Sequence, residues 1–291
     1  MGNKNVEKFI EKRLETVKNI IVVLSGKGGV GKSTVTAALA TALSTEKPGS
    51  IGVLDADFGG AVVPMIFGVE KGTITSHRHF ELSPVVGPFG LKFFSYGFLL
   101  GEKVPVTMRG VTKYQALRGI LSHMNWGKLD YLLIDMPPGT ADDALNIAFA
   151  LPRIDGAVIV TAPSRVSNVP VSKSVTFCEQ YDIRVLGVIE NMSSLVCPHC
   201  GGEINLFGAS GKAEKMSREA GVPFLGQIPF DERIPKSMDE GVPYLTRYPD
   251  SLASIAMKKI TNRIKAELTV SVQEKGNQPG ASGASVVKSD S

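Results

Sequence analysis

A short glycine- and lysine-rich segment has the spacing G-x-x-x-x-G-K-S/T. It consists of Gly26, Lys27, Gly28, Gly29, Val30, Gly31, Lys32, Ser33 and Thr34. Glycines allow successive backbone N–H groups to turn towards a phosphate, and a helix that starts behind them adds the positive end of its dipole. In this pattern Lys32 contacts the terminal phosphates and the Ser33 hydroxyl binds Mg²⁺. The segment therefore predicts a site for ATP and Mg²⁺, whereas the alternative, an ordinary glycine-rich turn, is disfavoured by the spacing.

Two acidic motifs follow apolar runs and have the residues to complete phosphoryl-transfer chemistry. The first is Asp55-Ala56-Asp57, and the second begins at Asp135 in the sequence Asp-Met-Pro-Pro-Gly-Thr. A carboxylate at the carboxyl end of a parallel strand can hold Mg²⁺ or one of its waters, and another can orient an attacking water. Taken alone, an Asp before a turn is more often a helix cap or a turn former. The glycine-rich segment favours the catalytic interpretation.

Asn191 and Asp231 follow two later apolar runs. The amide of Asn191 offers both a hydrogen-bond donor and an acceptor, which suits the edge of an adenine base. Turn formation is the alternative for both residues.

Two of the three cysteines, Cys197 and Cys200, stand in the sequence Cys-Pro-His-Cys-Gly-Gly. Such a knuckle brings two thiolates to one metal ion, because Pro sets the turn and Gly allows positive φ. Two thiolates are half of the ligands that zinc or a [4Fe–4S] cluster takes, and neither Cys178 nor His199 is well spaced to add to them. A twofold partner can supply a second pair, so the ligand count predicts a metal site that bridges a homodimer. A redox dithiol and two inert cysteines are the alternatives.

Short apolar runs alternate with helical patterns along most of the chain. The runs lie at residues 20–24, 51–54, 131–134, 157–160, 185–189 and 224–227. Their length and flanking Gly, Pro and Asp residues predict strands buried on both faces. The helical patterns lie at residues 32–44, 114–123, 142–150, 172–181, 212–220 and 251–267. This alternation predicts an α/β fold, with a doubly wound, mostly parallel sheet and helices on both faces.

The chain divides into three predicted segments. Residues 1–18 are expected to form an amphipathic helix packed on the domain, because apolar residues recur there at helical spacing. These apolar residues are Val6, Phe9, Ile10, Leu14 and Val17. Residues 19–268 are predicted to form the ATPase domain, with its metal loop at 197–200 and an irregular strand at 91–96. Residues 269–291 are mostly Ser, Gly, Gln and Lys, which predicts a disordered tail.

Composition narrows the class of protein. Of the 291 residues, 43% are hydrophobic and 21% charged, which is typical of a globular chain. The formal net charge of +4 is too small to require nucleic acid or an anionic membrane as partner. The longest apolar runs are far shorter than the roughly twenty residues of a membrane span, and the N-terminus does not resemble a secretory signal. We therefore expect a cytoplasmic protein without nucleic-acid or membrane partners.

Together these motifs resemble the Mrp/ApbC family of iron–sulfur cluster carrier ATPases over residues 19–265. That family belongs to the MinD/ParA-like ATPases with a deviant P-loop, marked here by Lys27, and has the P-loop NTPase fold of nitrogenase iron protein. The resemblance implies a homodimer that binds and slowly hydrolyses ATP. It implies that iron–sulfur scaffold proteins supply a labile [4Fe–4S] cluster, which is held between C-x-x-C pairs and passed to apo-proteins.

The resemblance also implies roles for individual residues. The roles are catalysis for Lys27, Lys32 and Asp57, Mg²⁺ binding for Ser33 and Asp135, base binding for Asn191 and Asp231, and cluster binding for Cys197 and Cys200. Lys27 would reach across the dimer to the phosphates of the partner's nucleotide, and Asp57 would activate the attacking water.

Three features depart from the family pattern. Residues 59–64 replace the usual Gly-Pro-Ser stretch, which puts the coupling of hydrolysis in question. Residues 161–165 replace the common Thr-Pro-Gln form, and an N-terminal four-cysteine cluster is absent from this sequence. Two alternatives stay open, namely a positioning ATPase of the MinD or ParA type and a structural zinc ion at the cysteine pair.

Overall fold

The computed structural model describes residues 3–57, 62–76, 81–100, 110–139, 142–163, 168–197 and 199–276. The strands of this part of the chain are β1 (Val17–Leu24), β2 (Ile51–Asp55), β3 (Thr75–Ser76), β4 (Leu82–Ser83), β5 (Val85–Val86), β6 (Lys92–Ser95), β7 (Leu129–Asp135), β8 (Gly156–Thr161), β9 (Val185–Val196), β10 (Glu203–Ile204) and β11 (Phe224–Phe230). One large sheet has the order β10-β9-β8-β1-β7-β2-β6-β5, with β11 also paired to β9, while β3 pairs with β4. The large sheet is mostly parallel, and β10 and β5 are antiparallel to their neighbours.

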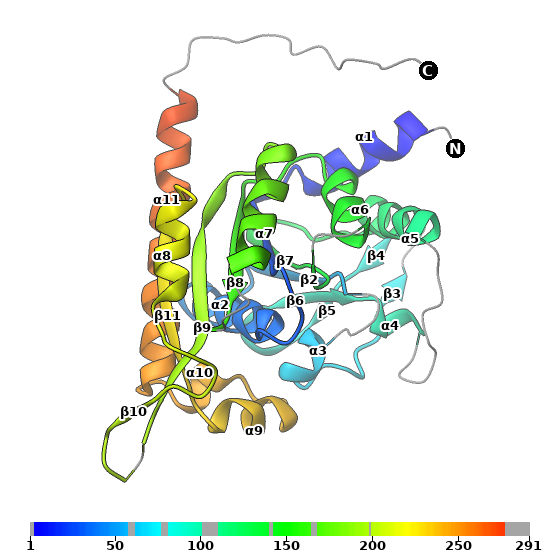
Figure 1. Cartoon of the computed structure of the whole chain (residues 1–291). Coiled ribbons are helices and arrows are strands. Elements are labelled where there is room, and N and C mark those ends of the chain that lie inside the picture. The colour runs from blue at the N-terminus through cyan, green and yellow to red at the C-terminus, as the bar shows by residue number, and fades with distance from the viewer. Residues whose placement is uncertain are drawn as a thin grey trace.

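Helices cover both faces of the large sheet (Figure 1). They are α1 (Asn3–Leu14), α2 (Lys32–Glu46), α3 (Val63–Ile66), α4 (Gly97–Leu100), α5 (Gly110–His123), α6 (Asp142–Ala150), α7 (Asn168–Gln180), α8 (Lys212–Glu219), α9 (Arg233–Asp239), α10 (Tyr244–Arg247) and α11 (Leu252–Gly276), with a short 3₁₀ turn at Pro88–Gly90. One core contains α1, α5, α6, α7 and α8, and the other contains α2, α3, α10 and α11. The predicted fold class is therefore confirmed.

The central strand β1 shows why the apolar runs specify this fold. Ile20 and Val22 pack in one core, whereas Ile21 and Val23 pack in the other. Side chains alternate across a strand, so an unbroken apolar run can serve both faces of a covered sheet. Since β1 lies between β8 and β7, the glycine-rich segment that follows it emerges near the middle of the sheet.

The helix expected over residues 1–18 ends at Leu14, and Val17 belongs to β1. Its backbone pairs with Leu129 of β7, and its side chain is buried. Val17 lies at helical spacing from Leu14, but a strand partner more than a hundred residues away determines its conformation. The helix itself packs on the domain as predicted, since Ile10 and Leu14 are both buried.

The last helix of the domain extends past residue 268, where the tail is expected to begin. Helix α11 continues to Gly276, so residues 269–276 of the predicted tail are helical. Residues 277–291, the rest of that tail, lie outside the described residues. The irregular strand predicted at 91–96 is present as β6.

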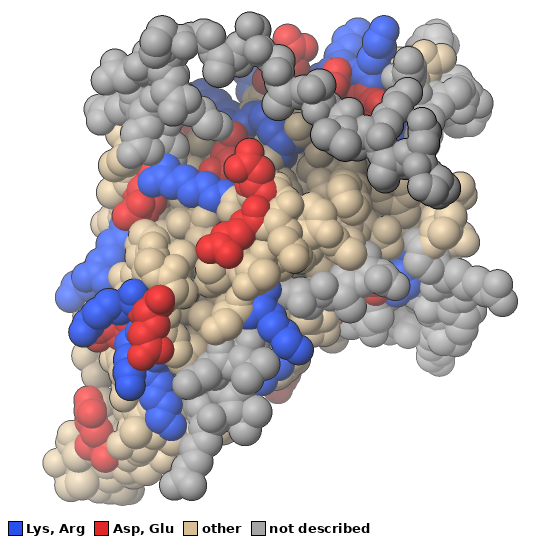
Figure 2. All heavy atoms as spheres, turned by 45° about the horizontal axis from the view of Figure 1, so that its top comes forward, with Lys and Arg blue, Asp and Glu red and all other residues tan. Residues whose placement is uncertain are grey.

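The described surface mixes charged side chains of both signs and exposes several apolar residues, three of which lie in and just after β10. Lysine and arginine side chains are interspersed with aspartate and glutamate over the described part of the face shown in Figure 2. Ile204, Leu206 and Phe207, which follow the cysteine pair, are each more than two-fifths exposed. Among the described residues, no helix has the length and apolar character needed to cross a lipid bilayer.

Candidate nucleotide site and cysteine hairpin

The glycine-rich segment forms the loop between β1 and α2. Gly29 and Gly31 have φ of 76° and 78°, in the left-handed region that favours glycine, and Gly31 stands directly before α2. The Ser25 hydroxyl donates a hydrogen bond to the carbonyl oxygen of Lys27 at 3.0 Å. The carbonyl oxygen of Ser25 accepts one from the N–H of Gly139 at 2.9 Å. The second acidic motif thus contacts the loop through its backbone.

Asp135, at the end of β7, organises a polar network at the start of α2. Its carboxylate accepts hydrogen bonds from Ser33 Oγ and Thr36 Oγ1, both at 2.6 Å, and pairs with Lys32 Nζ at 2.7 Å. Asp135 and Lys32 are both buried, so the low local dielectric strengthens their attraction. Ser33 and Asp135 supply the oxygen ligands that Mg²⁺ prefers, so the donor set fits that ion. The structure brings these three predicted residues together and adds Thr36, whose only sequence signal is its position one helical turn after Lys32.

Asp55 is a second buried carboxyl group beside this network. The sequence motifs assign a role to Asp57 and none to Asp55. It stands opposite Asp135 in the pairing of β2 with β7. Its carboxylate accepts hydrogen bonds from the N–H groups of Val63 at 3.1 Å and Asp57 at 3.3 Å. Burial, together with the negative charge of Asp135, raises the pKa of Asp55 to about 8. Asp57, the predicted water-activating residue, lies next to it and is half-buried.

This raised pKa predicts a pH dependence of stability in the nucleotide-free protein. The unfolded chain loses the Asp55 proton near its ordinary pKa of 3.8, whereas the folded chain keeps it up to about pH 8. Between these values the folded state binds more protons, so this group makes the free energy of unfolding fall as pH rises. Asp55→Asn should remove that decline, so that variant and wild type diverge by about 3–4 kcal/mol in favour of the variant between pH 5 and pH 8. Urea unfolding at both pH values tests this, and a constant difference would contradict it.

Asn191, predicted to contact adenine, lies against the glycine-rich loop. Its side-chain Nδ2 donates a hydrogen bond to the carbonyl oxygen of Val30 at 2.9 Å, and the residue is 4% exposed. A Cβ added to Gly31 would lie 2.3 Å from the same nitrogen. This close approach explains why glycine is needed at that point in the loop.

Gly31→Ala should therefore destabilise the fold more than Gly29→Ala does. Both positions have positive φ, which strains an alanine by about 1 kcal/mol. Only the Gly31 variant also drives a Cβ into Asn191, since nothing lies within 4 Å of the corresponding position at Gly29. We expect the free energy of unfolding in urea to fall by about 1–3 kcal/mol more for Gly31→Ala. Equal losses in the two variants would contradict this packing.

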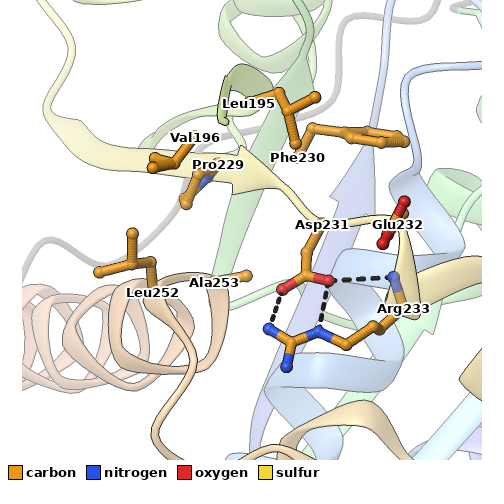
Figure 3. Close-up of a pocket in the computed structure, with 9 residues that line it drawn as sticks. All are labelled: Leu195, Val196, Pro229, Phe230, Asp231, Glu232, Arg233, Leu252 and Ala253. Atoms are coloured by element: carbon orange, nitrogen blue, oxygen red, sulfur yellow. Dashed lines mark hydrogen bonds and ion pairs between the residues drawn. The ribbon is translucent and has the colours of Figure 1, made fainter. Parts of the chain in front are cut away.

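Asp231 follows β11 and lies at a cavity of about 430 Å³ (Figure 3). The lining residues are Leu195, Val196, Pro229, Phe230, Asp231, Glu232, Arg233, Leu252 and Ala253. Partial burial alone would raise the pKa of Asp231, but the Arg233 guanidinium and the Tyr244 hydroxyl lower it to about 2. The Arg233 side chain bonds both carboxylate oxygens, at 2.8 and 2.6 Å, and Tyr244 donates at 2.5 Å. The carboxylate is thus ionised and held by two partners at a cavity with both apolar and charged lining residues.

Cys197 and Cys200 lie in the loop between β9 and β10, on a hairpin that projects from the body of the molecule (Figure 1). The N–H of Cys197 donates to the carbonyl oxygen of Gly202, and the N–H of Gly201 donates to that of Cys197, both at 2.9 Å. Cys197 is half-buried and Cys200 is exposed. Backbone N–H groups of Cys200 and His199 lower the pKa of the Cys197 thiol, which favours the thiolate that binds metal.

The cysteine pair supplies two thiols, which is half of the ligand set of a tetrahedral metal centre. Within the described residues, no group of three or more His, Cys, Asp or Glu side chains is placed to hold a metal ion. Cys178 is fully buried, and burial raises the pKa of its thiol to about 12, as expected for an inert core cysteine. Any tetrahedral centre at the hairpin therefore needs ligands in addition to the two thiolates.

The chain is similar in sequence to proteins named as iron–sulfur cluster carriers. A protein named iron–sulfur cluster carrier protein from Saccharolobus solfataricus is 44% identical over 260 residues, which are 89% of this chain and 87% of that protein. A protein of the same name from Methanocaldococcus jannaschii is 45% identical over 256 residues, 88% of this chain and 87% of that protein.

Solved structures share the fold, and a family model covers most of the sequence. A nucleotide-binding protein from Archaeoglobus fulgidus, solved in complex with ADP, is 39% identical with a TM-score of 0.72, over 81% of this chain and 92% of that one. MinD from Pyrococcus horikoshii shares the fold alone. It is 22% identical with a TM-score of 0.61, over 85% of this chain and 96% of that one. Residues 16–265 match the model described as ParA: NUBPL iron-transfer P-loop NTPase. The chain belongs to this family of iron-transfer P-loop NTPases.

Proposed function

We propose that this protein is an ATP-dependent carrier of iron–sulfur clusters that works as a homodimer. The observation that carries the proposal is the path of β9, which contacts the P-loop at Asn191 and leads directly into Cys197. One strand thereby joins a nucleotide site to a pair of metal-binding thiols. The names of the relatives at 44–45% identity support iron–sulfur clusters as the cargo.

The nucleotide is ATP with Mg²⁺, bound at the start of α2. Lys32 binds the terminal phosphates and Ser33 binds Mg²⁺, with Asp135 as the carboxylate that holds the ion or one of its waters. Asp57 orients the attacking water, and Lys27 reaches the phosphates of the partner's nucleotide. We expect slow hydrolysis, because none of the arginines in the described part of the chain bonds to the P-loop or to Asp135, where a transition-state ligand would lie.

The adenine base lies beside the middle of β9 and the end of β11. Asn191 and Ile228 are paired across these strands, and Asp231 follows shortly after. The amide of Asn191 has a second N–H and an acceptor oxygen for the base edge, and Asp231 borders a cavity that a flat ring can enter.

The cargo is a labile [4Fe–4S] cluster held by four thiolates, two from each chain. Cys197 and Cys200 of both chains complete the ligand set that neither chain supplies alone. The exposed Ile204, Leu206 and Phe207 give the projecting hairpin an apolar surface that a second copy can cover. Because the ligands lie at an exposed interface, the cluster stays accessible to a recipient.

Scaffold proteins supply the cluster and apo-proteins receive it, in a reducing cytoplasm that keeps the thiols free. Transfer is tested by mixing the anaerobically reconstituted protein with an apo-enzyme that needs a [4Fe–4S] cluster, in the presence of an iron chelator. We expect the activity of the recipient to recover while the chelator remains uncoloured. Recovery that the chelator abolishes would mean release of free iron and would contradict direct transfer.

A further inference from the structure

Strand β9 is irregular between its P-loop contact and its cysteines. Asn191 pairs with Ile228 of β11, and Leu195 pairs with Phe230. Between these two pairs β9 advances by four residues, whereas β11 advances by only two. The surplus forms a bulge at residues 192–194. Bulges bend the strand that carries them and are common beside functional sites.

Met192, in this bulge, has a strained backbone. Its φ of 57° lies in the left-handed region, which costs a side chain of this kind about 1–2 kcal/mol. Phe89 and Asp182 are the other described non-glycine residues with positive φ, and both lie outside strands. Such strain persists only where surrounding contacts hold it in place.

The P-loop is one of the surfaces that hold Met192. A Cβ added to Gly31 would lie 3.3 Å from Met192 Cε, so the methionine side chain rests on the residue where the loop becomes α2. The preceding residue, Asn191, is hydrogen-bonded to Val30 of the same loop. Two consecutive residues of β9 therefore contact the loop that encloses the phosphates.

The strand on the other side of Met192 is anchored. Glu190 is fully buried, and its carboxylate accepts hydrogen bonds from the N–H groups of Gly211 at 2.8 Å and Ala213 at 2.9 Å, at the start of α8. It also accepts one from the Gln227 amide of β11 at 3.1 Å. Because β9 is fixed at Glu190, a displacement at the bulge is passed towards the hairpin, which projects from the body and begins at Cys197 (Figure 1).

We infer that Met192 is a positioning residue through which nucleotide in the P-loop changes the orientation and exposure of Cys197 and Cys200. A bound phosphate alters the loop surface on which Met192 rests, and the strained bulge converts that change into movement of the hairpin. The inference rests on the proposed function for its cargo. The coupling itself concerns only the nucleotide and the thiols, so it is measurable without a cluster.

The test measures alkylation of metal-free, reduced protein by iodoacetamide, with and without Mg·ADP. Mass spectrometry gives the rates at Cys197 and Cys200, and the buried Cys178 serves as an internal reference for global unfolding. For wild type we expect the nucleotide to change the rates by about fivefold, the lower end of typical coupling between sites. Met192→Gly and Met192→Asn relieve the positive φ. In both variants the ratio of the alkylation rates with and without Mg·ADP should be close to one, while the affinity for ADP stays within about threefold of wild type.

Two variants separate this role from a merely structural one. Met192→Leu keeps the bulk and the strain and should keep the wild-type ratio. Phe89→Gly relieves a positive φ far along the chain from the bulge and should also keep it. A ratio of one in wild type, or a wild-type ratio in both Met192→Gly and Met192→Asn, would overturn the inference. Nucleotide-dependent alkylation in a protein that never binds iron would refute the carrier proposal and leave the coupling intact.

Discussion

Replacing both Cys197 and Cys200 by serine should lower the iron content of the anaerobically reconstituted protein by at least about tenfold. A neutral hydroxyl is a poor substitute for a thiolate, and the described residues contain no other group of three or more metal-ligating side chains. Iron and sulfide assays, together with the thiolate-to-iron absorption, measure the loss. Since two chains contribute to one centre, we expect each single variant to lose most of the iron as well.

Cys178→Ala is the matched control for these variants. Its thiol is buried in the core that contains α7, so its removal leaves a small cavity without touching the hairpin. The variant should unfold at lower urea concentration and still take up iron as wild type does. Iron retained by the double serine variant, or lost from a folded Cys178→Ala protein, would contradict the assignment of the ligands.

Lys32→Ala should weaken ADP binding by at least about 100-fold, or about 3 kcal/mol. The Lys32 ammonium is the cation that pairs with Asp135 where the P-loop enters α2, and its loss leaves the buried carboxyls Asp55 and Asp135 facing the phosphates. Lys27→Ala should instead leave the affinity within about threefold and slow turnover by at least about tenfold, because its proposed contact is made across the dimer during hydrolysis. Calorimetry and phosphate release separate the two effects.

The lysine variants need a check on folding and a control for lost charge. Removal of Lys32 leaves a buried carboxylate without its partner, a change that typically costs about 3–5 kcal/mol, so unfolding curves must accompany the binding data. Lys128→Ala removes an exposed lysine outside the site and should alter neither affinity nor turnover. Equal ATPase rates in wild type, Lys27→Ala and Lys32→Ala would contradict both roles.

The parts of the site that sequence predicts are those built from adjacent residues. The P-loop requires its glycines, lysine and serine in one short stretch, so spacing alone identifies it. Asp135 is predictable as the last residue of an apolar strand. The distinction between Asp55 and Asp57 is not predictable in this way, because only the pairing of β2 with β7 places Asp55 opposite Asp135 and buries it.

Other features depend on contacts between distant segments and leave little local signal. Val17 fits the helical spacing of the residues before it, yet pairing with β7 makes it part of a strand. The bulge at Met192 is defined only by the register of β9 against β11. Helix α11 continues to Gly276, beyond the apolar spacing that predicts its end near residue 267. Sequence thus predicts the elements well and their ends and irregularities poorly.

The content of iron and sulfide per chain, measured without oxygen on protein of known oligomeric mass, tests the shared cluster most directly. Four thiolates from two chains around one [4Fe–4S] centre predict about two iron and two sulfide per chain, all in a dimer. Loss of the metal should accompany dissociation or exposure of Cys197 and Cys200. A monomer that carries zinc and no sulfide, or a dimer whose four cysteines stay free after reconstitution, would contradict the proposed function.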